Sequence, residues 1–192
     1  MAQADFQRLL ATRLRQLREQ QGWSLERLAE QAGVSRSNIS SIERGQSSPT
    51  AAVLDRLATA LGIPLASLFA GLQVKPTESP CYRHDEQDVW VDPASGYQRR
   101  RLTALQAAPL QMVEVVFPPG QRVSYEPLPL ATDWHQQIWM LEGRMQIHSA
   151  GIDWQLMPGD CLCMSIEGGT EFFNPGDTSA RYLVALTRGQ TL

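Results

Sequence analysis

With 192 residues, the chain has room for more than one domain. Its net charge of −3 argues against a nonspecific coat for nucleic acids, and no stretch approaches the ~20 apolar residues that a membrane helix needs. Three cysteines, an odd number, indicate a reducing compartment rather than a disulfide scaffold. Residues 1–16 predict an amphipathic helix rather than an export signal, so we expect a cytoplasmic protein without a membrane partner.

Residues 22–45 carry the most informative pattern, GWSLERLAEQAGVSRSNISSIERG. It predicts two short helices joined by a tight glycine turn, the helix-turn-helix that places one helix in the major groove of DNA. The first helix is expected at about residues 25–32, because one apolar face is formed by Leu25, Leu28, Ala29 and Ala32. Ser24 is its expected N-cap, and Gly33 follows where a left-handed conformation costs least.

The second helix is expected to begin after its N-cap, Ser35, and to point Ile39 and Ile42 inward. The side chains between these positions are small or polar and could reach base edges: Arg36, Ser37, Asn38, Ser40 and Ser41. The alternative is a helical hairpin that only packs against its neighbours. A purely structural helix would rarely be this poor in apolar residues, so we favour a DNA reader.

Residues 8–69 resemble the lambda-repressor-like (Xre-type) DNA-binding domain of bacterial regulators, a unit of five helices. The matching segments are RLRQLREQQGWSLERLAEQAG, VSRSNISSIERG, SSPT and LDRLATALGIPLASLF. The resemblance implies that bases are read by Arg36, Ser37 and Ser41, and that phosphates are contacted by Ser24, Ser35 and Arg44. It also implies an internal ion pair between Arg18 and Glu43, to which we give a structural role.

Charge divides the chain at about residue 70. Residues 1–70 carry eight arginines against six acidic residues, whereas residues 71–192 carry nine basic residues against fourteen acidic ones. The segment GLQVKPTESP, residues 71–80, is broken by prolines and has little periodicity. We therefore expect a DNA-binding domain at 1–70, a linker at 71–82 and a second domain at 83–192.

The second domain shows short alternating runs that predict strands. We expect them at 89–91, 98–105, 110–117, 137–142, 144–149, 152–156, 161–164, 171–173 and 181–187, with Ala150-Gly151 as a hairpin turn. Residues 105–188 resemble the cupin barrel, through IWMLEGRMQI, WQLMPGDCLCM and GGTEFFNPGDTSARYLVAL. The match rests on turn residues Gly143, Pro158, Gly159, Asp160, Asn174 and Gly176. The expected fold is thus an all-α helix-turn-helix domain followed by an all-β cupin (double-stranded β-helix, jelly-roll) barrel.

Metal-binding cupins supply three histidines and a glutamate from two motifs. The corresponding positions here hold Ala131, Asp133, Gln137 and Glu171. A first-row metal prefers at least three well-placed donors, so we expect no metal, no cofactor, no catalytic residue and no enzyme. Two rivals stay open: a metal-dependent cupin enzyme fused to a DNA reader, and a barrel that serves only dimerisation.

Strand alternation predicts which side chains line the barrel and contact a ligand: Met112, Tyr125, His135, Gln137, Trp139, Met164, Glu171 and Tyr182. The same residues also describe an ordinary core, and a register slip of one residue would invert the list. Glu114 and Glu171 would favour a ligand with an amine. The alternative reading of His135 is a polar residue at the barrel mouth.

Two further groups on the expected strands leave alternatives open. Arg99 and Arg101 share a strand face that could enter the pocket and bind a carboxylate; otherwise they belong to a charged edge strand or contact a partner subunit. Cys161 and Cys163 are expected to be small core residues, with a redox sensor or a zinc site as less favoured readings.

Together these features predict a transcriptional regulator. A homodimer would bind a double-stranded DNA operator, and a small-molecule effector in the barrel would change the spacing of the two readers. The resemblance implies a role in the metabolism of amino acids, peptides, polyamines or sulfur compounds, without choosing among them.

Overall fold

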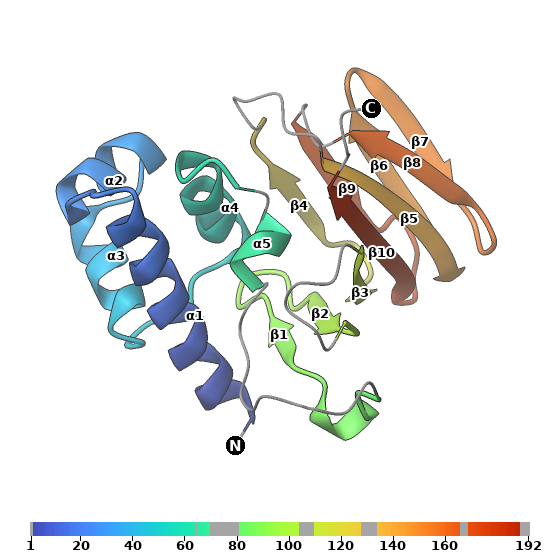
Figure 1. Ribbon diagram of the computed structural model, residues 1–192. Coiled ribbons are helices and arrows are strands. Elements are labelled where there is room, and N and C mark those ends of the chain that lie inside the picture. Colours follow the sequence, from blue (N-terminus) through green and yellow to red (C-terminus); the bar gives the residue numbers. More distant parts are fainter. Residues whose placement is uncertain are drawn as a thin grey trace. The chain divides into compact units, whose positions relative to one another are not determined.

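The computed structural model describes residues 2–63, 65–69, 81–103, 110–127, 134–165 and 169–188 (Figure 1). Internal contacts divide the chain into two units, Met1–Pro76 and Thr77–Leu192, which we call unit 1 and unit 2. Most of the expected linker lies outside the described residues, so its limits stay a prediction.

Unit 1 is helical and contains the five helices that the sequence predicted. They are α1 (Ala2–Gln20), α2 (Leu25–Ala32), α3 (Arg36–Glu43), α4 (Ala51–Ala60) and α5 (Leu65–Phe69). The expected caps are confirmed: the hydroxyl of Ser24 accepts from the Arg27 amide, and that of Ser35 accepts from the Asn38 amide. Gly33 ends α2 in the left-handed region, at φ 60°. The fully buried core residues include Leu14, Leu28, Ile39, Ile42, Leu54 and Leu57.

Unit 2 contains a short 3-10 helix at His84–Glu86 and two antiparallel sheets. The six-stranded sheet has the order β1 (Val89–Val91), β2 (Gln98–Arg101), β3 (Leu110–Phe117), β10 (Ala180–Arg188), β5 (Trp134–Glu142), β8 (Cys161–Ser165). The four-stranded sheet has the order β4 (Arg122–Tyr125), β9 (Thr170–Phe173), β6 (Met145–Ser149), β7 (Ile152–Leu156). This is the cupin fold that the turn motifs predicted.

The core of unit 2 lies between the two sheets. Phe172 of the four-stranded sheet stacks on Tyr182 of the six-stranded sheet, with ring centroids 6.4 Å apart. Along β3 the buried positions are Val113, Val115 and Phe117, which alternate with more exposed ones. Strand β4 was not predicted, and β2 ends at Arg101, earlier than the expected limit of residue 105.

The cupin-like turn motifs act structurally. Ala150 and Gly151 have φ of 51° and 76° and close the β6–β7 hairpin, because both central residues of such a turn need positive φ. Asn174 is fully buried, and its side-chain amide donates to the carbonyls of Phe117 and Thr178, at 3.0 and 2.9 Å. Its side-chain oxygen accepts from the Gly176 amide. The amide thereby fixes the turn that precedes β10.

Candidate functional site

Helix α3 separates its side chains into two faces. At 100° per residue, Arg36, Ser37, Ser40, Ser41 and Arg44 fall within an arc of roughly 140°, which we call the outer arc. Ile39 and Ile42 lie on the opposite side and are fully buried. In the outer arc, Arg36, Ser37 and Arg44 are exposed and the two serines are half-buried. The predicted base-reading side chains are therefore brought together on one accessible surface, with Asn38 at its border.

The two arginines of the outer arc lie at opposite ends of the helix, Arg36 at its first residue and Arg44 at its C-cap. Arg36 pairs with Glu26 of α2, and both side chains are more than 60% exposed. The pKa of Glu26 is lowered, first by a hydrogen bond with its own backbone and then by the charge of Arg36. Arg44 donates to the Ser40 hydroxyl and, at 2.8 Å, to the side-chain oxygen of Gln46. These surface contacts are weak, so both guanidinium groups can exchange them for another acceptor.

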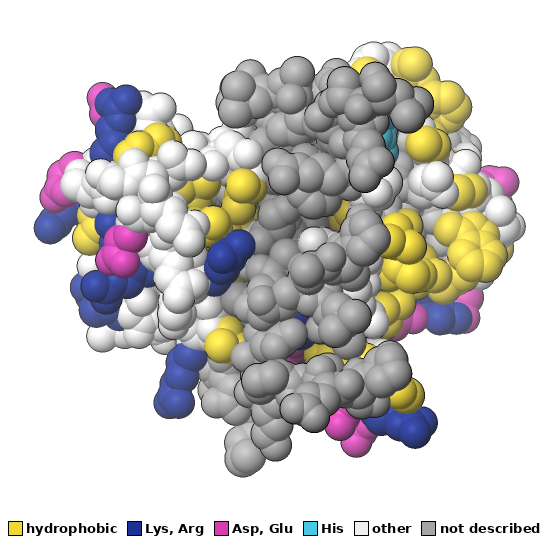
Figure 2. All heavy atoms as spheres, viewed as in Figure 1, with side chains coloured by type: hydrophobic (Ala, Val, Ile, Leu, Met, Phe, Trp, Pro, Cys, Tyr) yellow, Lys and Arg dark blue, Asp and Glu magenta, His cyan; other side chains and the backbone are white. Residues whose placement is uncertain are grey.

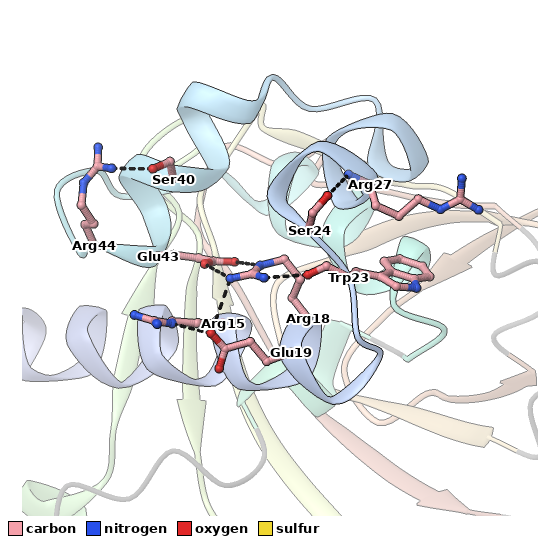
Figure 3. Close-up of polar contacts among 9 residues, drawn as sticks. All are labelled: Arg15, Arg18, Glu19, Trp23, Ser24, Arg27, Ser40, Glu43 and Arg44. Carbon is pink, nitrogen blue, oxygen red and sulfur yellow. Dashed lines mark hydrogen bonds and ion pairs between the residues drawn. The ribbon is translucent and has the colours of Figure 1, made fainter.

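The predicted internal ion pair is confirmed, and it anchors α3 to α1. Arg18 donates to both carboxylate oxygens of Glu43 at 2.8 Å, and its third nitrogen donates to the Trp23 carbonyl at 2.7 Å. The side chains of Arg18 and Glu43 are only 11% and 7% exposed. The pKa of Arg18 is raised by its hydrogen bond to Glu43. Figure 3 shows this pair between α1 and α3, while the Arg44–Ser40 contact lies farther from α1 in the view.

The interior of unit 2 contains a cluster of polar aromatic residues around one arginine. Strand register places Arg99 beside Trp90 of β1 and Val115 of β3, and Val115 beside Tyr182 of β10. Because Trp90, Val115 and Tyr182 are buried, Arg99 points to the same inner face. The hydroxyls of Tyr97 and Tyr125 are 2.8 Å apart, which joins the two sheets. The sequence analysis named Arg99 as a possible pocket residue but did not name Tyr97. Strand alternation through Tyr97, Arg99 and Arg101 would have indicated that these side chains share a face.

Unit 1 matches a family of known proteins. Residues 14–68 match the Helix-turn-helix family HTH_3. SutR, an HTH-type transcriptional regulator of Escherichia coli (strain K12), is 51% identical over 34% of this chain and 37% of its own length. The HTH-type transcriptional regulator DdrOP3 of Deinococcus deserti is 32% identical over 46% of this chain and 70% of its own length. This chain belongs to the HTH-type transcriptional regulators.

Two comparisons extend over both units of the regulator. PuuR, an HTH-type transcriptional regulator of Escherichia coli (strain K12), is 26% identical over 91% of the chain and 92% of its own length. The crystal structure of an HTH_3 family transcriptional regulator from Vibrio cholerae covers 97% of the chain and 99% of its own, with 22% identity and a TM-score of 0.74. The regulator therefore shares the two-unit fold of that protein, although it spans only about a third of the length of SutR.

The prediction that the regulator is not an enzyme is corrected by the structural comparison. Hydroxypropylphosphonic acid epoxidase from S. wedmorenis matches 94% of the regulator and 97% of its own chain, with 19% identity and a TM-score of 0.47. The proteins with similar structures thus include an enzyme, and the prediction that the regulator has no catalytic activity no longer holds. A likeness at this TM-score gives no argument for a reaction either, so the enzyme status of the regulator is open.

The predicted lining of the barrel is brought together only in part. Tyr125, Met164 and Tyr182 share the inner face with their buried neighbours on β4, β8 and β10. The others alternate with buried residues and lie on the outer faces of β3, β5 and β9: Met112, His135, Gln137, Trp139 and Glu171. Trp139 is 49% exposed. The inferred register is wrong by one residue in these strands, and the ligand role of the inner residues stays a prediction.

The acidic residues expected to favour an amine lie outside the barrel as well. Glu114 pairs with Arg181 at 3.0 Å and with Arg100 at 3.5 Å, and Glu171 pairs with Arg122. The expectation of a ligand amine held by these carboxylates is therefore wrong. The edge-strand alternative for the arginines is wrong too, because β2 lies between β1 and β3.

The outer surface of unit 2 carries the cysteines and several apolar side chains. Cys161 and Cys163 are exposed rather than buried, because they lie on the outer face of β8. Figure 2 shows hydrophobic side chains gathered over the part of unit 2 that Figure 1 labels β5, β7 and β8. The large exposed ones in this region include Trp139, Ile152, Trp154 and Met157.

The described part of the regulator shows neither a metal-binding cluster nor a membrane-spanning helix. No group of three or more histidine, cysteine, aspartate or glutamate side chains comes together there as a metal site would require. Two of the four positions compared with metal-binding cupins, Ala131 and Asp133, lie outside the described residues, so the expectation of no metal stays a prediction. No helix within the described ranges is long and apolar enough to cross a membrane.

Proposed function

We propose that this regulator binds double-stranded DNA at a specific operator, with α3 in the major groove. The observation that carries the proposal is the outer arc of α3, which is polar and accessible and has an arginine near each end of the helix. The buried Arg18–Glu43 pair anchors the same helix beside the face that carries Ile39. A helix fixed on one face and polar on the other is suited to reading base edges.

Each residue of the interface has a proposed role. Arg36 grips a guanine through two hydrogen bonds, with Ser37 and Ser41 at neighbouring bases. Ser24, Ser35 and Arg44 contact phosphates, and the first two also present the N-termini of α2 and α3, whose backbone amides favour anions. Asn38 and Ser40 complete the surface. Phosphate contacts set affinity, whereas the base contacts set specificity.

Fluorescence anisotropy with a duplex selected from random sequence tests these roles. Arg36→Ala is expected to weaken binding to the selected duplex by about 1–3 kcal/mol and to relax base preference at one position. Arg44→Ala is expected to weaken all duplexes about equally and to lower the salt slope by about one unit. Arg15→Ala, which removes an exposed charge from α1, is the matched control and should bind as the wild type does. If the Arg36 and Arg44 variants behave alike, the division into base and phosphate contacts is wrong.

We further propose a cytoplasmic homodimer whose cupin barrel binds a small-molecule effector. Half-sites about one helical turn apart, roughly 34 Å, require two readers at a fixed spacing, and the effector acts by favouring one spacing. The tyrosine hydroxyls and the guanidinium inside unit 2 support a polar ligand. Native mass spectrometry tests both parts. A dimer with extra mass that is lost on denaturation supports them, whereas a monomer at micromolar concentration contradicts the dimer.

A further inference from the structure

Arg99 is the second of five inner-face residues in a row that crosses the six-stranded sheet. The register runs from Trp90 through Arg99, Val115 and Tyr182 to Met140, one residue from each of five neighbouring strands. The other four members are at most 3% exposed. A guanidinium is rarely placed in such a row, because removing a charge from water costs several kcal/mol unless polar groups or an opposite charge compensate.

The groups that act on Arg99 are tyrosine hydroxyls. Desolvation lowers the pKa of Arg99, but the pKa is raised overall because Tyr97, Tyr125 and Tyr182 lie close enough to interact with the guanidinium by charge as they ionise, and because Tyr97 is a hydrogen-bond partner. These rings are held in place by their neighbours: Tyr97 stacks on Phe117 at 5.3 Å, and Tyr125 meets Phe172 edge-on at 5.7 Å. The hydroxyls are therefore fixed around the guanidinium by aromatic packing.

Burial keeps the surrounding hydroxyls protonated. It raises the pKa values of Tyr97, Tyr125 and Tyr182 above the ordinary value near 10. At neutral pH these four side chains are therefore one cation and three protonated hydroxyls, and one hydroxyl proton is used in the hydrogen bond between Tyr97 and Tyr125. Arg99 and Tyr125 also keep part of their surface accessible, while Tyr97 and Tyr182 are almost fully buried. The Tyr125 hydroxyl also lies 2.8 Å from that of Tyr97, the hydrogen-bond partner of Arg99, so the guanidinium and the two hydroxyls form one connected polar group.

The neighbouring arginines on the same strand provide the comparison. Arg100 faces outward to Glu114, at 3.5 Å, and Arg101 pairs with Asp88 at 2.5 Å. Each of these two is paired with a carboxylate of the chain itself, and tyrosine hydroxyls act on Arg99 at the inner face. A planar carboxylate fits both the fork of a guanidinium and a neighbouring hydroxyl donor. One positive charge also matches a monoanion better than a dianion.

We propose that Arg99 and Tyr125 bind the carboxylate of the effector inside the cupin barrel, so that the regulator senses a small organic acid. This inference rests on the proposed effector function of the barrel and deepens it by naming the ligand class. Tyr182 lies along the same row and stacks on Phe172, which provides an apolar wall for the body of the ligand.

Thermal unfolding of the full chain with defined probes tests the site. The probes are acetate and benzoate, exchanged for chloride at constant ionic strength, against the neutral acetamide and benzamide and the cationic methylammonium and benzylamine. At least one carboxylate is expected to raise the midpoint of the unfolding of unit 2, while its amide and amine do not. Isothermal titration with that carboxylate should show affinity lowered about ten- to hundredfold by Arg99→Met and less by Tyr125→Phe, because bonds to charged groups contribute about 1.5–3 kcal/mol.

Arg100→Met is the matched control, since it removes a positive charge from the outer face of the same strand. It should leave carboxylate affinity unchanged. Arg99→Lys guards against misfolding, because it keeps the charge and should retain part of the binding. The proposal is overturned if no carboxylate exceeds its amide, if inorganic phosphate stabilises more strongly, or if the effect survives in Arg99→Met. Anisotropy with the selected duplex in the absence of anion reports the DNA-binding function separately, so either conclusion can fail alone.

Discussion

Replacing Arg18 or Glu43 by methionine removes one half of the buried ion pair that joins α1 to α3. Methionine is chosen because its length and helix propensity are close to those of both residues. In Arg18→Met the Glu43 carboxylate, 7% exposed, loses two hydrogen bonds of 2.8 Å, and the Trp23 carbonyl loses a third. Leaving one charge of such a pair without its partner costs about 3–5 kcal/mol.

The double variant Arg18→Met/Glu43→Met removes both charges and restores apolar contact between the helices. Because exchange of a whole buried pair for apolar side chains is often nearly neutral, we expect it to lose only about 1 kcal/mol relative to the wild type, mainly through the unsatisfied Trp23 carbonyl. The coupling between the two sites, which is the sum of the two single losses minus the double loss, is then about 5 kcal/mol or more. Arg15→Met is the control, since it breaks the exposed Arg15–Glu19 pair on α1 and should leave stability unchanged.

Urea unfolding followed by circular dichroism at 222 nm measures the stability of the five proteins, because the helices of unit 1 dominate this signal. The expected order of stability is wild type and Arg15→Met first, then the double variant, then the two single variants of the pair. If the single variants unfold at the same urea concentration as Arg15→Met, the pair contributes no stability. If the double variant loses the sum of the two single losses, the pair is not coupled. Either result refutes the reasoning.

Two further predictions concern unit 2. Gly143→Ala is expected to destabilise unit 2 by about 2–4 kcal/mol, because φ is 72° and the new Cβ would lie 2.8 Å from the Ala180 Cα. Gly120→Ala is the control: its φ is 69°, but the new Cβ would lie in open space, so the loss should be only about 1 kcal/mol. Tryptophan fluorescence during urea unfolding compares the two variants. Stability should fall as pH rises above about 10, because tyrosines of the unfolded chain then lose protons that the folded state retains at its raised pKa values. Absorbance at 295 nm with urea unfolding at pH 8–11 measures this, and stability that stays constant up to pH 11 would contradict it; the slope should be smaller when phenylalanine replaces one of Tyr97, Tyr125 or Tyr182.

Unit 1 could be predicted almost completely because its signals are local. A capping hydroxyl such as Ser24 or Ser35 acts within three residues of the helix start, and Gly33 acts at the turn itself. The ion pair of Arg18 and Glu43 spans 25 residues and was expected only from family resemblance. Local chemistry therefore predicted α1, α2 and α3, and family resemblance added the five-helix unit and the long-range contact.

Unit 2 was predicted in its strands and turns but not in its register. Strand β5 has apolar side chains on both faces, with Ile138 buried and Trp139 49% exposed, so alternation did not indicate which face is inside. Strand β3 has the same ambiguity, since Met112 on the outer face precedes the buried Val113. Which face of each strand is buried depends on the side of the sheet on which the second sheet packs. That packing is a long-range property, which local alternation does not show. The inner positions of Tyr97 and Arg99 were not predicted either, because polar side chains are usually expected on the outer face of a sheet.

The two faces of α3 make the specificity of this regulator separable from its stability. The side that faces the core is fixed by Ile39, Ile42 and the Glu43 bond to Arg18, whereas Arg36, Ser37 and Ser41 belong to the outer arc. Substitutions at Arg36, Ser37 or Ser41 can therefore change which sequence is read without a new core having to be found. One scaffold can in this way be retargeted to many operators, by natural drift or by a designed library confined to three positions.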